Sequence, residues 1–252
     1  MTTTATDTRT IPPLRHREAM QLAATEYGRL LDAVDRLAPD DWAKATVNDG
    51  WGVKAMLGHV LGMMEMNAGL REMRRQVSTA TKAAKESGRP GIDELTGLQV
   101  HEHAGLSTDE IVAGLRRMAP RALEGRSRPP RFLRALPVVD PMVPGEPKWK
   151  LGYLLDVILT RDVWTHRGDL ARAVGQELVV TSEHDGRIVA DVVREWAGRH
   201  GQPFTLVLTG PAGGTYTQGT GGEHHELDAV EFCRILSGRG SGTGLLTKGV
   251  PF

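Results

Sequence analysis

Residues 151–175 read LGYLLDVILTRDVWTHRGDLARAVG and predict a helix with ionisable side chains inside its apolar stripe. Leu159, Asp162 and His166 follow one another at steps of three and four, so they share one helix face. Gly175 is a typical helix stop. Burying the Asp162 carboxylate without a partner would cost several kcal/mol. We therefore expect a cation or a hydrogen-bond donor beside it.

A second amphipathic stretch, from Val53 to Met73, contains His59 among its apolar positions. Asp162 and His166 are four residues apart, so they are able to bind one ion while His59 approaches from a neighbouring helix. Two histidines and one carboxylate leave a coordination position open, which is typical of catalytic rather than structural zinc. An inward histidine taken alone is more often a hydrogen-bonded core residue. The three residues together favour a metal site.

Other polar motifs offer competing explanations. Asp162 has an alternative partner in Arg161 or Arg167, but residues this close in sequence project to other helix faces. The motifs His101-Glu102-His103 and His224-His225 lie in polar, loop-like sequence, where histidines are more often solvated than bound to metal. We therefore rank both histidine motifs below the first site.

The composition limits the class of protein. The chain has 252 residues, 40% hydrophobic and 25% charged, and a formal net charge of +0, which favours neither nucleic acid nor an anionic membrane as partner. Cys233 is the single cysteine, so an internal disulfide is excluded and a reducing cytoplasm is expected. It falls in a predicted helix and is expected to be a buried structural thiol. No apolar run reaches the length of a membrane span.

Helical and strand-like patterns divide the chain. Apolar spacing predicts bundle helices at 20–37, 53–73 and 151–173, and the capping box of Ser107 and Glu110 begins another. Residues 78–106 show no clear period, and the proline-rich stretch 126–147 is expected to be an irregular crossover. Beyond Gly175 the pattern changes, with strands expected at 178–180, 204–208 and 215–217, and helices at 183–199 and 228–236. The glycine-rich stretch 210–222 is expected to form hairpin turns rather than a phosphate site.

These patterns predict an α+β protein of two domains. Residues 1–13 are expected to be a disordered lead-in, because they are Thr-rich with paired prolines and lack the build of a secretion signal. Residues 14–176 are expected to form a four-helix bundle, and residues 177–252 a smaller α+β domain.

Three motifs, in this order along the chain, resemble the mycothiol-dependent maleylpyruvate isomerase family: WGVKAMLGH (51–59), RDVWTHRGDLARAVG (161–175) and EFCRILSGR (231–239). The resemblance covers nearly the whole chain. It implies a DinB-like, metal-binding four-helix bundle followed by a C-terminal domain akin to sterol-carrier folds, which agrees with the layout above.

The resemblance also implies site residues and cofactors. His59, Asp162 and His166 are implied to hold a divalent metal, with zinc preferred, although the family's better-known isomerases have Glu where Asp162 stands. An arginine of the second domain is implicated in activity, and Arg239 or Arg234 occupies the matching neighbourhood. Mycothiol is implied as the low-molecular-weight thiol cosubstrate.

Metal-bound thiol chemistry then gives the leading functional hypothesis. A thiolate that adds to an activated alkene and leaves again gives cis-trans isomerisation, whereas one that attacks a small electrophilic substrate and stays gives S-transfer. An arginine is able to bind a substrate carboxylate through two hydrogen bonds. The alternatives are a non-catalytic protein that binds an apolar ligand in its C-terminal domain, and a metal-dependent hydrolase.

Overall fold

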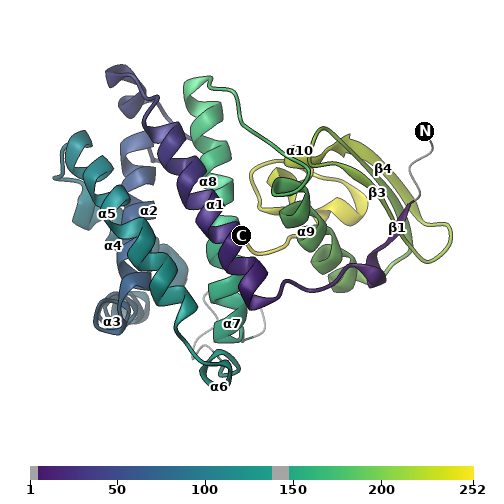
Figure 1. The fold of residues 1–252 in the computed structure, drawn as a ribbon, viewed down its shortest axis with the longest axis horizontal. Coiled ribbons are helices and arrows are strands. Elements are labelled where there is room, and N and C mark those ends of the chain that lie inside the picture. The colour runs from purple at the N-terminus through teal and green to yellow at the C-terminus, as the bar shows by residue number, and fades with distance from the viewer. Residues whose placement is uncertain (1–4, 138–147) are drawn as a thin grey trace. The chain divides into compact units, whose positions relative to one another are not determined.

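The chain folds as two compact units in the computed structural model, which describes residues 5–137 and 148–252. Residues 16–178 form one of them, called here the helical unit. Residues 1–15 and 179–252 form the other, the sheet unit. Figure 1 shows that the first consists of helices and that the second holds the strands. The predicted α+β class is thus confirmed.

The helical unit is built on the helices that the apolar spacing predicts. They are α1 (His16–Val34), α2 (Val53–Ala68), α5 (Thr108–Ser127) and α8 (Leu159–Val174). Figure 1 shows α1 and α8 side by side, and α2 packs against α5. Their apolar faces enclose one core, which includes Leu30, Val34, Met56, Leu57, Val60, Leu61, Ile111, Leu115, Val163 and Leu170. This core fixes α2 and α8, the two helices that carry the predicted metal ligands.

The stretch 78–106, where no period was evident, is largely helical. The predicted helix 53–73 breaks at Gly69, which has an extended backbone, and α3 (Leu70–Ser87) begins there. Helix α4 (Gly91–His103) follows and packs on both α2 and α3. Few side chains of α3 are buried and most of its residues are polar, so the helix was missed, although Leu70, Met73, Val77 and Ala80 follow one another at steps of three and four. The lack of a clear period in this stretch therefore did not mean a lack of helices, since most of it belongs to α3 and α4.

The helix ends of the α5 and α8 region agree with their sequence signals. The Ser107 hydroxyl accepts a hydrogen bond from the backbone N–H of Glu110, and the backbone N–H of Ser107 donates to Oε2 of Glu110, as in a capping box. Gly175 ends α8 with a φ of 73°, in the left-handed region that favours glycine. The predicted crossover is partly helical, since α5 continues to Ser127 and α6 spans Arg131–Arg134. Its residues 138–147 lie outside the described part of the chain.

The predicted helix 151–173 is interrupted by a π-helical segment. It consists of α7 (Leu151–Tyr153), the π-helical residues Leu154–Ile158, and α8. The buried Arg126 of α5 supports this segment by donating from Nε and Nη2 to the Leu155 carbonyl, at 2.9 and 2.7 Å. Nη2 also donates to the Thr160 hydroxyl at 2.6 Å. These hydrogen bonds fix the start of α8, where Thr160 lies two residues before Asp162.

The sheet unit contains a four-stranded mixed sheet of order β1-β3-β2-β4. Its strands are β1 (Thr6–Asp7), β2 (Phe204–Thr209), β3 (Gly214–Gln218) and β4 (Glu223–Asp228). Strands β2 and β3 form an antiparallel hairpin, while β1 pairs in parallel with β3 and β4 in parallel with β2. The glycine-rich stretch supplies the turn of the β2–β3 hairpin, as expected, with a positive φ at Gly210. Its second turn, with a positive φ at Gly219, is not a hairpin, because it leads from β3 to β4, which are not neighbours in the sheet.

Helices α9 (Asp185–His200) and α10 (Ala229–Leu236) complete the sheet unit. Trp196 of α9 is fully buried, and its ring meets Phe204 of β2 at 4.7 Å and Phe232 of α10 at 5.4 Å between centroids. Cys233 is buried in α10, as predicted for a structural thiol. These contacts make one apolar core from a helix, a strand and a second helix.

Three expectations for the sheet unit differ from the structure. Residues 178–180 form no strand, and the strand β4 contains the histidine pair that was expected in a loop. The lead-in expected to be disordered contributes β1, and Thr8 within it is buried and donates to Oε1 of Gln218 at 3.0 Å. Residues 1–4 of that lead-in lie outside the described part of the chain.

In the parts of the chain that the structure describes, we find no helix both long and apolar enough to cross a membrane.

Candidate metal centre

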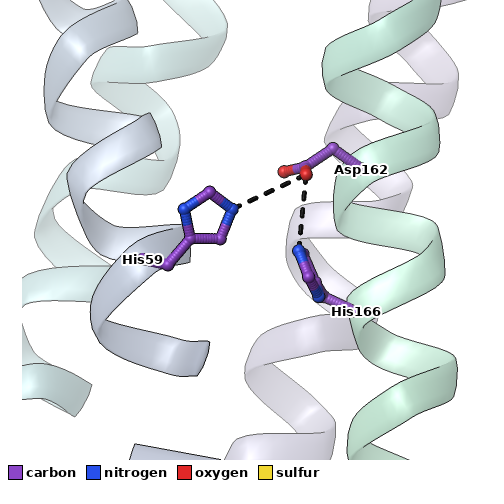
Figure 2. A group of neighbouring side chains, drawn as sticks. All are labelled: His59, Asp162 and His166. Carbon is purple, nitrogen blue, oxygen red and sulfur yellow. Dashed lines mark ion pairs between the residues drawn. The ribbon is translucent and has the colours of Figure 1, made fainter. Parts of the chain in front are cut away.

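His59, Asp162 and His166 converge within the helical unit (Figure 2). His59 lies on α2, and the other two lie one turn apart on α8. Oδ1 of Asp162 is 3.4 Å from Nε2 of His166 and 3.7 Å from Nε2 of His59. All three potential ligand atoms lie within 4.8 Å of one another. The structure thus brings together the three side chains that the sequence singled out.

Burial and charge act in opposite directions on the Asp162 carboxyl. Burial by itself raises its pKa, but in the metal-free protein the two imidazoles, when protonated, lower it by charge and hydrogen bonding, His166 first and then His59. The net effect holds the pKa of Asp162 well below its ordinary value. The carboxylate is therefore ionised at neutral pH, which is the form that binds a cation.

The second nitrogen of each imidazole faces a hydrogen-bond acceptor. Nδ1 of His59 is 2.8 Å from Oε1 of the buried Gln99 on α4, and Nδ1 of His166 is 3.3 Å from Oδ2 of Asp169. When a neutral ring carries its hydrogen on Nδ1, the lone pair lies on Nε2; the hydrogen bond to Gln99 favours this form for His59, and the contact with Asp169 favours it for His166. Carbonyl and carboxylate acceptors of this kind typically orient histidines that ligate metals.

The donor set fits a divalent ion. Zinc bonds of about 2.0–2.2 Å to nitrogen and oxygen place tetrahedral ligand atoms about 3.3–3.6 Å apart, close to the separations from Asp162 to the two histidines. Oδ2 of Asp162 is buried and accepts no hydrogen bond from the residues that the structure describes. Such a group usually indicates a missing ion or water. Three protein ligands leave a position for a further ligand, as in catalytic zinc sites.

Arg161 and Arg167, the alternative partners of Asp162, form no described ion pair with it, as expected for residues on other faces of the helix. Arg167 lies on another face of α8 and forms a buried ion pair with Glu26 of α1, at 2.9 Å from Nε to Oε2. Arg161 is buried as well. The ion pairs described for Asp162 are those with His59 and His166.

The rival histidine motifs have structural partners. In the first motif, His101 is exposed while His103 is buried in α4, with Nε2 3.1 Å from Oε2 of Glu65. In the second, His225 lies in β4 with Nε2 2.9 Å from Oε2 of Glu223. Their loop assignment was wrong, because both motifs lie within regular elements.

The two candidate arginines both lie in the sheet unit. Arg234, on α10, donates from Nε to Oε2 of Glu231 at 3.1 Å and from Nη2 to the carbonyl of Arg239 at 3.0 Å. Arg239 follows the helix and is half-buried. The two residues are thus joined directly, with the side chain of the first holding the backbone of the second.

The sequence analysis missed the residues that support the ligands. Gln99 fell in the stretch where no period was recognised, although Leu95, Gln99 and His103 recur every four residues and form the buried face of α4. Trp51, whose ring centroid is 5.3 Å from that of His59, was noted only as part of a motif. The four-residue repeat on α4 was the signal that would have identified Gln99.

Comparisons with known proteins agree on one family. The family model described as the mycothiol maleylpyruvate isomerase N-terminal domain matches residues 23–171. A crystal structure of a mycothiol-dependent maleylpyruvate isomerase is similar with a TM-score of 0.59 at 16% identity, and a histidine-to-alanine mutant of such an enzyme with 0.58 at 15%. Each likeness covers 94% of this chain and 93% of that chain, and shows the fold. The search of curated proteins found no match.

Proposed function

Because the chain belongs to the mycothiol maleylpyruvate isomerase family by its N-terminal domain, we propose that it is a metal- and mycothiol-dependent enzyme. Cis-trans isomerisation of a small electrophilic alkene is the proposed reaction. The observation that carries the proposal is the convergence of His59, Asp162 and His166, with Nε2 of each ring facing an ionised carboxylate. All three lie in the helical unit, whose residues 16–178 include the whole matched range 23–171.

The residues of the centre prepare it to bind a cation and a sulfur ligand. When bound, a divalent ion with two neutral imidazoles and one carboxylate keeps net positive charge and lowers the pKa of a coordinated thiol. His59 and His166 present lone pairs, and Asp162 supplies the single negative charge among the ligands. Burial of His59 and His166, and partial burial of Asp162, limit the access of water that would compete for the open position. Zinc suits this set of nitrogen and oxygen ligands.

A thiolate isomerises an activated alkene by adding and leaving. The carbon–sulfur bond forms while the π electrons move to the conjugated carbonyl, the remaining single bond rotates, and departure of the thiolate restores the double bond in the other configuration. The thiol is recovered unchanged. S-transfer begins with the same attack but consumes the thiol, so measuring thiol during turnover distinguishes the two reactions.

Arg239 or Arg234 is proposed to bind a carboxylate of the substrate. An arginine provides two parallel N–H donors with fixed geometry, which suits a carboxylate. The hydrogen bond from Arg234 to the Arg239 carbonyl makes a positioning role for Arg234 as reasonable as direct binding. We expect Arg239→Ala to spare metal binding and to impair turnover. Unchanged turnover in that variant would exclude Arg239.

The test of the proposal joins metal content with thiol-dependent turnover. Protein purified without chelator or affinity-tag metal should contain about one divalent ion per chain, and His59→Ala should lose it. His101→Ala is the matched control, because His101 is an exposed histidine of α4. Maleylpyruvate should be isomerised by the parent and the control only when mycothiol is added.

Two outcomes would contradict the proposal. A parent that contains no metal, and takes up none on addition, would exclude the metal centre. Turnover that proceeds equally well without a thiol would instead favour activation of water and a hydrolytic reaction.

A further inference from the structure

Gln99 is fully buried and lies between His59 and a second buried amide, Gln76 of α3. Its Oε1 is 2.8 Å from Nδ1 of His59, and its Nε2 donates to Oε1 of Gln76 at 2.8 Å and to the sulfur of Met63 at 3.1 Å. The amide therefore spans from α4 to both α2 and α3. The orientation of the two amides decides which nitrogen of His59 carries the proton.

The far end of this chain of hydrogen bonds has a fixed direction. Nε2 of Gln76 lies 3.2 Å from the carbonyl oxygen of Gly62 and 2.9 Å from Oε1 of Glu72. A backbone carbonyl only accepts. Hydrogen bonds from Arg75 outweigh burial and hold the pKa of the Glu72 carboxyl below its ordinary value, so Glu72 is an ionised acceptor as well. Gln76 must therefore turn its NH₂ toward both groups and its Oε1 toward Gln99.

The remaining steps follow from donor and acceptor matching. Because Oε1 of Gln76 accepts, Gln99 must present its NH₂ to it, and the Met63 sulfur, a weak acceptor, agrees with that orientation. Oε1 of Gln99 then faces His59, so Nδ1 of His59 must carry the hydrogen. The lone pair of His59 is left on Nε2, which points toward Asp162.

We infer that Gln99, oriented by Gln76, is a positioning residue that fixes His59 in the tautomer able to ligate a metal through Nε2. This inference rests on the metal centre of the proposed function and names the residues that prepare one of its ligands. Without such a partner, neutral imidazole exchanges between its two tautomers, and the Nε2–H form is unable to bind the ion. Residues of this kind typically change metal affinity by about 10–100-fold when they are replaced.

Gly62 provides the room that Gln99 needs. A Cβ atom added at Gly62 would lie 2.7 Å from both Cβ and Cγ of Gln99, closer than such atoms approach. Gly62 thus has two functions in this network, since its carbonyl orients Gln76 and its missing side chain admits Gln99. A side chain at this position would displace the amide from His59.

The test reads the tautomer directly in metal-free protein. In the full chain labelled with ¹⁵N-histidine and stripped by chelator, a long-range ¹H–¹⁵N spectrum should show His59 with a protonated Nδ1 and an unprotonated Nε2. Gln99→Met keeps the length of the side chain and removes the acceptor, so a substantial Nε2–H population should appear. Gln76→Met should also shift the tautomer, although Gln76 does not touch His59. Gln21→Met, an exposed glutamine of α1, should leave it unchanged.

Zinc affinity, measured by competition with a chromophoric chelator, supplies the second readout. It should fall by about 10–100-fold in Gln99→Met and remain at the parent value in Gln21→Met. Gly62→Ala should act like Gln99→Met, and Gly97→Ala is its control, because a Cβ there meets nothing within 4 Å. Helical circular dichroism verifies that each variant is folded.

The outcomes separate this inference from the proposed function. A His59 that keeps its Nδ1–H tautomer in folded Gln99→Met, or a parent with Nε2–H, would overturn the positioning role even if zinc binds. A parent with the expected tautomer that binds no metal would instead contradict the proposed function, while the role of Gln99 in fixing the ring would stand.

Discussion

Asp162 provides the negative charge among the three proposed ligands, and its variants should separate charge from reach. Asp162→Asn keeps the size of the side chain but offers a neutral amide oxygen. We expect its zinc affinity to fall by more than the roughly 10–100-fold typical of losing a supporting residue. Asp162→Glu keeps the charge and adds one methylene, so its affinity should remain within about tenfold of the parent. Competition with a chromophoric chelator measures both.

The family resemblance makes the glutamate variant informative. The better-known isomerases of the family are expected to have Glu at this position, so the surrounding helices should accommodate the longer side chain. Equal affinities in Asp162→Asn and the parent would show that the carboxylate is not a ligand.

His103 should give the helical unit a pH-dependent stability that is separate from the metal. Its Nδ1 is 2.7 Å from the Gln99 carbonyl and its Nε2 is 3.1 Å from Glu65, so both nitrogens face acceptors. The hydrogen bond to Glu65 outweighs burial and raises the pKa of His103 above its ordinary 6.5. A raised pKa stabilises the folded state fully below the unfolded value, and this contribution is lost as the pH rises through the folded value.

The matched variant is Glu65→Gln, which keeps an acceptor but removes the charge. In urea unfolding of metal-free protein, the free energy of unfolding of the parent should exceed that of the variant most below about pH 6.5. The difference should shrink as the pH rises past the raised pKa of His103. A difference that stays constant over this range would contradict the assignment.

The three proposed ligands could be singled out from the sequence, whereas the residues that support them could not. Asp162 and His166 belong to one helix, where spacing alone fixes that they share a face. The contact between His59 on α2 and Gln99 on α4 joins two residues that lie 40 positions apart in sequence. Its geometry depends on how closely α2 and α4 pack, which no local period encodes.

The π-helical segment before α8 should depend on Arg126. The buried guanidinium donates to the Leu155 carbonyl and to Thr160, and its Nη1 donates to the Tyr27 hydroxyl at 3.0 Å. Arg126→Met keeps most of the apolar volume but leaves these acceptors without their donor. Each buried unsatisfied group costs about 1–3 kcal/mol, so we expect a loss of at least about 2 kcal/mol in the free energy of unfolding.

The control for this prediction lies two residues further along. Arg128 is exposed and pairs with Glu124 one turn away, so Arg128→Met should change the free energy of unfolding by less than about 0.5 kcal/mol. Urea unfolding of both variants provides the measurement. Equal stability of the two variants would show that the π-helical segment does not need the arginine.

Elements that bury many apolar residues were predicted well, and elements that bury few were not. Helices α1, α2, α5 and α8 bury regular stripes in one core, so their sequences show the period. Helix α3 buries only Gln76 and Ala80 within it, and β4 alternates between exposed and half-buried residues. For such elements the surrounding packing, rather than the local sequence, decides the conformation.

The sheet unit is discontinuous in sequence, which explains why its first strand escaped prediction. Strand β1 has two residues and pairs with β3 about 210 positions later, with Thr6 opposite Tyr216. A hydrogen bond from Arg187, on α9, to the Pro12 carbonyl also joins the N-terminal segment to the later part of the sheet unit. A two-residue strand carries no usable alternation, so only the folded sheet reveals its place.

This division of the chain leads to a prediction about a fragment. Every residue that forms or supports the proposed centre, from Trp51 through Gln99 to Asp169, belongs to the helical unit. A fragment of residues 14–178 should therefore fold, bind about one zinc ion per chain, and match the affinity of the full protein within about threefold. Arg234 and Arg239 are missing from it, so the fragment should not isomerise maleylpyruvate at any mycothiol concentration. A fragment with full helicity that binds no zinc would show that the sheet unit contributes to the metal centre, and a fragment with full turnover would remove both arginines from the mechanism.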